Sequence, residues 1–400
     1  MDKKISILID LRCLNYQFIT GVNAYTLRFL HCIWQLKKTN QKDWSIVGLG
    51  LKPNRREELE SEFNWLKELF DNHIDTSQYF NFLTKNNKLN ETRIVLESFF
   101  KQDINNKSIQ KFDYLFLPQP RTIFKNPNTK LITVVHDLFS IMDNSNNLTQ
   151  KLIYSKQNLR KILQSSYKII GNSISTCNDI KKVFNIQNKI NLVYPALPDI
   201  ASINTKRQIL EIKQANWQKN INKHQKYILA LSGIEKRKNW FNLILAYQQL
   251  QSELDSKCPY LILAGTVVDL KHYKQLVQLI KILKIKNIHW IHQPDEQQKN
   301  YLIKNCEIFV YPSIYEGFGF PILEAKKYKC TVVTSNISSM PEVGQDNCFY
   351  TNPFDYTDIA SCLFQTIQQK NQKSKINTSN KKIKKFNWQE LINWLSLNIQ

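Results

Sequence analysis

Several patterns that would assign a function directly are missing from this sequence. No two of the eight cysteines form a C-x-x-C pair, which argues against a zinc site or a disulfide framework and favours reduced thiols in a cytosolic core. No apolar run reaches about 18 residues, so a membrane-spanning helix is not expected. The chain has neither a Walker A sequence nor G-x-G-x-x-G, and the second absence argues against a dinucleotide-dependent oxidoreductase.

Acidic residues are scarce relative to basic ones. The chain has 33 acidic and 55 basic residues, a net charge of +22 that is spread over both halves. Such an excess fits a nucleic acid, an anionic membrane surface or a polyphosphate ligand as partner, and it also fits a biased composition. Aromatic residues do not interleave with the basic ones as they do in RNA-binding modules. We therefore expect no nucleic-acid partner.

A contact with an anionic membrane surface remains open. Residues 366–385 contain seven lysines and no acidic residue, and Tyr25–Lys38 is a predicted amphipathic helix that ends on basic residues. A solvated linker and a helix packed on a sheet are the structural alternatives. The apolar stretch Ile5–Ile9 is too short for a signal peptide. The expected location is cytoplasmic, which leaves room for peripheral attachment to the inner face of the cytoplasmic membrane.

Short apolar runs alternate with helical patterns along the whole chain. With 400 residues, this alternation predicts two doubly wound α/β domains, each with a parallel sheet covered on both faces. The predicted strands are Ile5–Ile9, Trp44–Leu49, Tyr114–Leu117, Leu131–Val135, Lys168–Gly171, Lys189–Val193, Tyr227–Leu231, Tyr260–Ala264, Ile288–Ile291, Ile308–Tyr311 and Thr331–Thr334.

The predicted domain boundary lies between Pro195 and His224, where Pro195–Pro198 interrupts regular structure. One helix is expected over Glu57–Phe70, followed by an irregular insertion or loop over residues 71–110. The predicted organisation is a first Rossmann-like domain over 1–195, a linker over 196–223, a second Rossmann-like domain over 224–380 and a terminal helix over 381–400.

The most informative stretch follows the predicted strand Ile308–Tyr311. A turn with two glycines leads to Pro321, a residue favoured at the start of a helix. The free amides of such a helix suit a phosphate. Glu316 and Glu324 can both face the ligand side, where carboxylates accept hydrogen bonds from the hydroxyls of a sugar or ribose. The alternative is one Glu that caps its helix and another that pairs with a lysine.

A second strand, Tyr227–Leu231, also leads into a turn that contains a glycine, Gly233. Arg237 and Lys238 follow this turn, immediately before a predicted helix. Cations at the carboxyl edge of the same sheet would neutralise a diphosphate as it leaves. The alternative is an ordinary basic surface loop.

Two further stretches lie at strand ends of the first predicted domain. His136 and Asp137 follow Leu131–Val135. His136 could donate a hydrogen bond to a substrate hydroxyl or interact with the charge that develops in the reaction; a structural His–Asp pair is the alternative. Gly21 opens a predicted helix that carries Tyr25, after a strand and a loop. This arrangement is typical of the first turn of a nucleotide-binding fold.

Together these residues resemble the GT-B glycosyltransferases, and among them the retaining glycosyltransferase family 4. Glu316 and Glu324 match the family's E-x7-E signature, Ser232–Asn239 its donor-phosphate turn with an R-K-N triplet, and Val135–Leu138 its V-H-D-L motif. Thr20–Tyr25 is similar to the family's T-G-I-G-R-Y-T loop. Phe386–Trp388 is similar to the F-S-W that opens a terminal helix, which in GT-B proteins crosses back onto the first domain.

The resemblance implies a GT-B fold, a cleft between the two domains and a nucleotide-sugar donor as substrate. It implies no cofactor and no metal. The acceptor would be a glycan or a lipid-linked glycan held by the first domain. The implied catalytic residues are Glu316, His136 and Lys238. The implied donor-binding residues are Gly233, Arg237, Lys238, Glu316, Gly317, Phe318, Gly319, Phe320 and Glu324; the implied acceptor-binding residues are Gly21, Tyr25 and Asp137.

The sequence departs from the family pattern on both sides of the expected site. Ser232 and Gly233 stand where the family often has Gly and Arg, and Asn23 and Ala24 replace a Gly and an Arg. We expect a retaining glycosyltransferase that builds a bacterial surface polysaccharide such as O-antigen or capsule. The alternative is a catalytically impaired GT-B-like protein that binds a glycan or a nucleotide.

Overall fold

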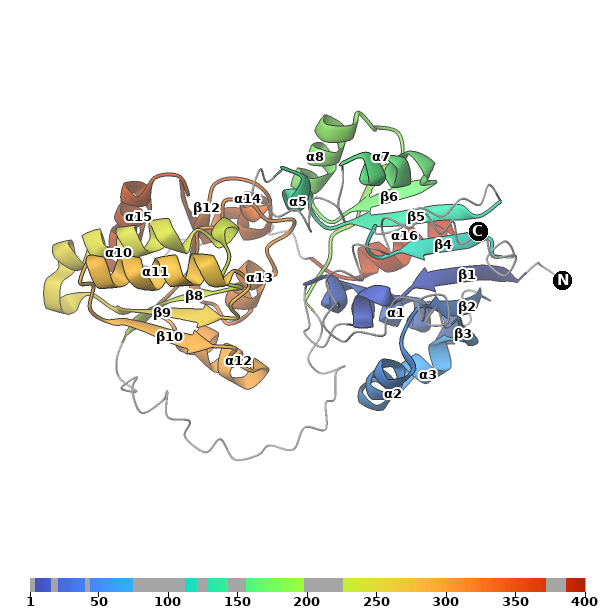
Figure 1. Cartoon of the computed structure of the whole chain (residues 1–400), viewed down its shortest axis with the longest axis horizontal. Coiled ribbons are helices and arrows are strands. Elements are labelled where there is room, and N and C mark those ends of the chain that lie inside the picture. Colours follow the sequence, from blue (N-terminus) through green and yellow to red (C-terminus); the bar gives the residue numbers. More distant parts are fainter. Residues whose placement is uncertain are drawn as a thin grey trace. The chain divides into compact units, whose positions relative to one another are not determined.

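A computed structural model of the chain describes residues 4–15, 21–39, 44–74, 112–120, 128–142, 156–197, 226–371 and 386–399. The chain divides into two compact units (Figure 1). Unit 1 comprises Met1–Thr205 together with Phe386–Gln400, and unit 2 comprises Lys206–Lys385. Each unit is built around its own parallel sheet.

The sheet of unit 1 has seven described strands in the order β3-β2-β1-β4-β5-β6-β7. All neighbouring strands run parallel, and Val135 lies opposite Gly171 in the register of β5 and β6. The strands are β1 (Ile5–Asp10), β2 (Trp44–Leu49), β3 (Asn72–Ile74), β4 (Tyr114–Leu117), β5 (Lys130–Val135), β6 (Lys168–Gly171) and β7 (Ile190–Leu192).

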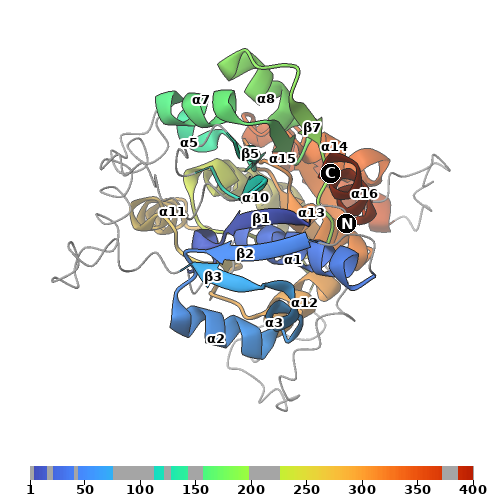
Figure 2. The ribbon, with the colours of Figure 1, turned by 90° about the vertical axis from the view of Figure 1, so that its right-hand side faces the viewer.

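Helices cover both faces of this sheet, because right-handed crossovers lead to opposite faces on the two sides of β1 and β4. One face packs against α1, α3 and the C-terminal helix α16 in a single apolar core, and α2 and α3 lie next to β3 (Figure 1 and Figure 2). Helices α7 and α8 bury apolar residues in a separate cluster. The helices are α1 (Gly21–Lys38), α2 (Pro53–Glu62), α3 (Trp65–Leu69), α5 (Phe139–Met142), α7 (Lys156–Ser165), α8 (Ile174–Phe184) and α16 (Gln389–Asn398).

The sheet of unit 2 has six described strands in the order β10-β9-β8-β11-β12-β13, again all parallel. The strand order reverses between β8 and β11, and such a reversal leaves a crevice at the carboxyl ends of the two strands. The strands are β8 (Tyr227–Leu231), β9 (Tyr260–Gly265), β10 (Ile288–His292), β11 (Ile308–Tyr311), β12 (Thr331–Ser335) and β13 (Cys348–Thr351).

The core of unit 2 lies between this sheet and its helices. Ile228 and Ala230 of β8 pack against α10, α11 and α15, whereas α13 packs on β11 and β12. The helices are α10 (Trp240–Leu254), α11 (Leu270–Ile282), α12 (Glu296–Asn305), α13 (Phe320–Lys327), α14 (Met340–Gly344) and α15 (Tyr356–Asn371). Two doubly wound parallel sheets confirm the predicted fold class.

The helix expected over Glu57–Phe70 is wrong as one continuous element. It breaks at Phe63, whose φ of −126° and ψ of 86° separate α2 from α3. In an unbroken helix Phe63 and Trp65 would point to nearly opposite sides. The break lets both side chains pack against the core of unit 1. Of the predicted irregular region, only Asp71–Ile74 lies within the described residues, and it contains β3.

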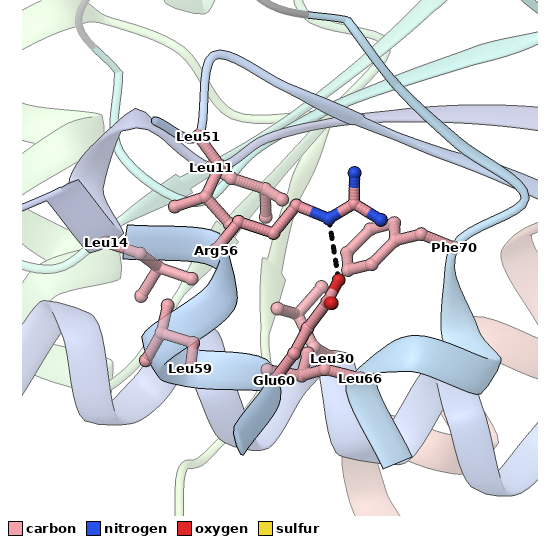
Figure 3. A pocket seen from close by; sticks show the side chains of 9 residues that line it. All are labelled: Leu11, Leu14, Leu30, Leu51, Arg56, Leu59, Glu60, Leu66 and Phe70. Atoms are coloured by element: carbon pink, nitrogen blue, oxygen red, sulfur yellow. Dashed lines mark hydrogen bonds and ion pairs between the residues drawn. The ribbon is translucent and has the colours of Figure 1, made fainter. Parts of the chain in front are cut away.

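A narrow apolar cavity lies in unit 1, with the ion pair of Arg56 and Glu60 at its edge (Figure 3). Its volume of about 10 Å³ is enough for one water at most, which is too small for a sugar or a nucleotide. It is lined by Leu11, Leu14, Leu30, Leu51, Arg56, Leu59, Glu60, Leu66 and Phe70. In the described part of the chain, no helix combines the length and the apolar character needed to cross a membrane.

Candidate functional site

The carboxyl ends of β8 and β11 lie side by side at the reversal point of unit 2. β8 leads through the turn at Gly233 to a 3-10 helix over Lys236–Lys238. β11 leads to the turn that holds Glu316. Because neighbouring parallel strands end at the same edge of the sheet, the fold brings together two segments that are about 80 residues apart in sequence.

A carboxylate held by two cations forms the centre of this site. One oxygen of Glu316, Oε2, lies 2.7 Å from Nη1 of Arg237. The other, Oε1, accepts hydrogen bonds from Nζ of Lys238 at 2.5 Å and from Oη of Tyr311 at 2.9 Å. Nε of Arg237 also pairs with Glu235 at 2.8 Å. Two cations and two carboxylates therefore balance one another.

Burial makes these charges interact strongly. Glu316 and Lys238 are each 7% exposed. Burial alone would raise the pKa of Glu316, but the ammonium of Lys238 and the guanidinium of Arg237 lower it to about 2. Burial lowers the pKa of Lys238 from its ordinary value, against the opposing effect of Glu316. At neutral pH the carboxylate is ionised, and its negative charge favours the ammonium form of Lys238 against the effect of burial.

Asn239 turns the backbone so that Lys238 faces inward. Its φ of 61° is left-handed, a conformation that asparagine adopts more readily than most residues. Its side-chain amide donates to the carbonyl oxygens of Pro312 at 3.0 Å and Pro353 at 2.6 Å. The R-K-N triplet thus combines two charged groups with the residue that fixes the direction of the turn.

Two serines after β12 hold the turn that contains Glu316. The hydroxyl of Ser338 accepts from the amide of Glu316 at 3.1 Å and donates to its carbonyl oxygen at 2.7 Å. The hydroxyl of Ser339 lies 2.9 Å from the carbonyl oxygens of both Glu316 and Phe318. Gly319, with a φ of 101°, then begins α13. The predicted turn and helix start are therefore both present, with Pro321 in the first helical turn.

The remaining residues of the glycine turn are largely enclosed. Gly317, Phe318 and Gly319 are buried, and the ring of Phe320 meets that of Phe318 edge-on at 5.2 Å. A side chain at Gly233 would approach Val268 to 3.0 Å. Because Gly233 has no side chain, the turn after β8 can lie close to Val268.

Glu324 occupies a different charge environment from Glu316. Burial raises its pKa, while Lys299 on α12 acts in the opposite direction and Glu296 adds to the rise. Lys238 and Arg237 are the charges that act on Glu316. Among the described residues, Glu316, Arg237 and Lys238 come together, and Glu324 belongs to a separate cluster with Lys299 on the neighbouring helix.

In unit 1, His136 lies at the carboxyl end of β5. Its Nε2 is 2.8 Å from the carbonyl oxygen of Pro118. A carbonyl oxygen only accepts, so Nε2 carries the proton. Burial lowers the pKa of His136, which favours the neutral ring with a lone pair on Nδ1. The expectation that this ring donates to a substrate hydroxyl is corrected, because its proton is already bound to Pro118; Nδ1 is an acceptor.

The predicted acceptor-binding residues fall into three environments. Tyr25 is only 1% exposed, and its ring lies edge-on to His136 at 4.9 Å and against Trp388 at 5.6 Å. Gly21 is exposed at the start of α1. Oδ1 of Asp137 accepts from the amide of Phe139, at the start of α5. Tyr25 thus supports His136 from within the core and does not present its ring to solvent.

Within the described part of the chain, the structure adds to the site several residues that the sequence prediction lacked. Tyr311 is the last residue of β11 and directly precedes the segment that contains Glu316. Its position at the carboxyl end of a strand could have indicated that it belongs to the site. Glu235 likewise lies beside the basic pair. Ser338 and Ser339 belong to another strand end, and only the sheet order β11-β12 places them beside Glu316.

Comparisons with known proteins agree with this fold. Residues 211–383 match a family described as glycosyl transferases group 1. O-antigen chain mannosyltransferase B of Escherichia coli is 29% identical over 263 residues, which are 62% of this chain and 65% of that protein. The serotype-specific mannosyltransferase WbdA of Escherichia coli is 36% identical over 144 residues, which are 35% of this chain and 17% of that protein. The chain thus aligns with less than two thirds of either relative.

Solved structures share the architecture over most of the chain. Anabaena Alr3699/HepE in complex with UDP and glucose superposes with a TM-score of 0.58 at 14% identity, covering 92% of this chain and 91% of that one. At this identity the likeness concerns the fold. A similar fold is therefore found in a protein whose structure was solved in complex with UDP and glucose.

Proposed function

We propose that the chain, whose residues 211–383 match the glycosyl transferases group 1 family, is a GT-B glycosyltransferase that transfers a sugar from a nucleotide-sugar donor to a glycan or lipid-linked glycan acceptor. The observation that carries this proposal is the buried cluster of Glu316, Arg237 and Lys238 at the reversal point of the unit 2 sheet. Cleavage of the bond between the sugar and the diphosphate leaves oxocarbenium character on the sugar and extra negative charge on the phosphate.

The two cations suit the leaving group. Lys238 and Arg237 stabilise the charge that develops on the diphosphate, and the amide groups at the start of α13 add to the positive potential. Glu316 accepts hydrogen bonds from the hydroxyls of the donor sugar. Glu324 binds hydroxyls of the ribose. The acceptor hydroxyl then attacks from the face that the diphosphate leaves, which retains the anomeric configuration.

We further propose that unit 1 binds the acceptor and that His136 contributes through Nδ1. A neutral imidazole with a free lone pair can accept the hydrogen of an incoming hydroxyl. Gly21, at the exposed start of α1, belongs to the same acceptor side, and so does the remaining carboxylate oxygen of Asp137. This assignment rests on the placement of these residues at the carboxyl edge of the unit 1 sheet.

The transferred sugar in this proposal is mannose, and the product is a bacterial surface polysaccharide such as O-antigen or capsule. Support comes from the printed functions of two relatives, an O-antigen chain mannosyltransferase and a serotype-specific mannosyltransferase. Thermal-shift measurements with GDP, UDP, GDP-mannose and UDP-sugars test the donor, because a ligand that binds the native state raises its apparent stability. A shift with UDP-sugars alone would contradict mannose transfer from GDP-mannose.

Turnover tests the proposed activity. With GDP-mannose and a lipid-linked glycan acceptor, we expect release of nucleoside diphosphate that falls by orders of magnitude in Glu316→Ala and in Lys238→Ala. Full activity in both variants would refute the site. Nucleotide binding without turnover by the wild type would favour the alternative, a GT-B-like binding protein, which the altered loop at Asn23 and Ala24 suggests.

We also propose that catalysis needs no metal and no cofactor, because Lys238 and Arg237 provide the positive charge at the diphosphate. Activity should then persist in EDTA, and a requirement for added Mg²⁺ or Mn²⁺ would contradict this. For location, we propose a cytoplasmic protein that contacts the inner membrane face through its basic surface. Co-sedimentation with anionic but not neutral vesicles would support that contact, and equal binding to both would oppose it.

A further inference from the structure

Tyr311 is an uncharged residue of the candidate site that forms hydrogen bonds with both Glu316 and Lys238. Its hydroxyl donates to Oε1 of Glu316 at 2.9 Å and accepts from Nζ of Lys238 at 2.8 Å. The same ammonium lies 5.1 Å from the centre of the Tyr311 ring. One side chain therefore contacts both members of the central ion pair.

The surroundings of Tyr311 fix its position. It is the last residue of β11, only 3% exposed, and its ring stacks on that of Phe309 at 6.2 Å. The hydroxyl of Thr334, on the adjacent strand, donates to its carbonyl oxygen at 2.8 Å. Burial raises the pKa of Tyr311 well above its ordinary value, so the hydroxyl keeps its proton.

Once a donor is bound, two negatively charged groups, the carboxylate of Glu316 and the diphosphate, attract the ammonium of Lys238. In the structure its ammonium is directed at Glu316, whereas the proposed function directs it at the diphosphate. If Lys238 moved alone, Oε1 of a buried carboxylate would lose a strong donor, and an uncompensated buried charge is costly. Tyr311 is uncharged and buried, so a phosphate attracts it only weakly. Its hydrogen bond to Glu316 can persist while Lys238 turns.

We propose that Tyr311 is a positioning residue, whose hydroxyl holds the carboxylate of Glu316 when the ammonium of Lys238 is drawn to the diphosphate of the donor. This rests on the proposed function, and it concerns a contact of this chain that lies outside the predicted site residues. Tyr311 lowers the cost of releasing Lys238 and keeps Glu316 aimed at the sugar.

Tyr311→Phe tests the hydroxyl while it leaves the ring in place. Tyr247→Phe is the matched control, because Tyr247 is equally buried in the same unit and donates to the carbonyl oxygens of Pro259 and Asn287. Binding of GDP and UDP is measured by calorimetry. At neutral pH we expect Tyr311→Phe to bind the nucleotide that the wild type prefers about 10- to 100-fold more weakly, the effect of one hydrogen bond to a charged group. Tyr247→Phe should bind as the wild type does.

The pH dependence gives a readout that a loss of stability would not reproduce. The charged groups that act on Lys238 are Glu316, Arg237 and Glu235. Loss of the hydroxyl acceptor disfavours the ammonium, so Lys238 should release its proton at lower pH in Tyr311→Phe. The decline of nucleotide affinity at high pH should therefore begin earlier in this variant than in the wild type or in Tyr247→Phe.

A double-mutant cycle decides whether Tyr311 acts through Glu316. In Glu316→Gln no charged oxygen remains to be uncovered, so adding Tyr311→Phe should weaken binding by less than about threefold. Equal losses in both backgrounds, or an unchanged affinity and pH profile in Tyr311→Phe, would overturn the proposal. If the wild type itself binds neither GDP nor UDP, the proposed function fails instead, and that result is distinguishable because it precedes any comparison of variants.

Discussion

At the scale of single residues, Glu316 is surrounded by more positive charge than one carboxylate requires. Arg237 and Lys238 both point at it, and Glu235 takes a second contact of Arg237. These charges neutralise one another. In the proposed function a diphosphate would therefore compete with two carboxylates for two cations.

Acid should weaken the fold through Glu316. Its pKa of about 2, against an ordinary 4.5, means that the ionised carboxylate stabilises the native state above about pH 4.5, and that this contribution is lost as the pH falls towards 2. A shift of this size corresponds to about 3 kcal/mol. Urea unfolding at a series of pH values should show a steep loss in the wild type and a flatter one in Glu316→Gln. Parallel pH profiles for the two proteins would contradict the assignment.

Variants at Asn239 separate two contributions to stability: its side-chain hydrogen bonds and its left-handed backbone conformation. Asn239→Gly keeps the left-handed φ of 61° available but removes both side-chain bonds, and it should destabilise by about 1–3 kcal/mol. Asn239→Ala removes the same bonds and adds strain of about 1–2 kcal/mol. The free energies of unfolding should therefore rank wild type, Gly, Ala. An alanine variant as stable as the glycine variant would show that the turn relaxes.

The residues of the site differ in how well the sequence alone could predict them. Glu316, Arg237 and Lys238 were predicted because each follows a recognisable strand, and parallel strands end at one edge. Tyr311 was overlooked because a tyrosine at the end of a strand usually belongs to the core, which is also true here. The sequence could not indicate that Lys299 rather than Lys238 lies nearest to Glu324, since this depends on the packing of α12 against α13.

At the scale of elements, the site depends on how closely the ends of β8 and β9 approach each other. A Cβ at Gly265 would lie 1.7 Å from the carbonyl oxygen of Ser232. No side chain fits there unless the backbone moves. The turn that leads to Arg237 and Lys238 can therefore pack directly against the end of β9, because Gly265 has no side chain.

Gly265→Ala should be strongly destabilising for this reason, by at least about 2 kcal/mol. Gly233→Ala is the matched control on the same turn: its Cβ would meet only Cγ2 of Val268 at 3.0 Å. Val268 is 63% exposed and can rotate away, so the change in unfolding free energy should stay within about 0.5 kcal/mol. Chemical denaturation measures both variants. Equal stability of the two would show that the β9 end yields easily.

Two strands, β3 and β13, were missed in the sequence analysis. β3 has three residues, too few for an apolar run to be told from a loop. β13 is only half-buried over most of its length, whereas β11, which is equally short, is fully buried. Strands such as β8 and β11 were placed within a residue because they are continuous apolar runs, typical of strands buried on both faces. Phe63 shows the opposite failure: an apolar spacing that fits one long helix is divided because two neighbouring aromatic side chains pack into one core.

At the scale of the whole molecule, the chain leaves unit 1, builds unit 2 and returns to unit 1 with its last residues. The returning segment is part of the first core. Trp388 contacts Tyr25, which in turn contacts His136, and Leu391 and Leu395 are completely buried in the same apolar cluster. The C-terminal helix thus contacts Tyr25 and, through it, supports the position of His136.

This arrangement predicts that α16 stabilises unit 1 although residues 206–385, which form unit 2, separate it in sequence from the rest of that unit. Leu391→Ala or Leu395→Ala should cost about 2–5 kcal/mol, as for other buried leucines. Leu397→Ala is the matched control, because this leucine lies on the same helix and is 70% exposed; its effect should stay within about 0.5 kcal/mol. Amide hydrogen exchange gives the location: faster exchange is expected in α1 and β1, with β8 and β11 of unit 2 unchanged. If Leu395→Ala behaved like Leu397→Ala, or if exchange rose first in unit 2, the C-terminal helix would not be a structural part of the first core.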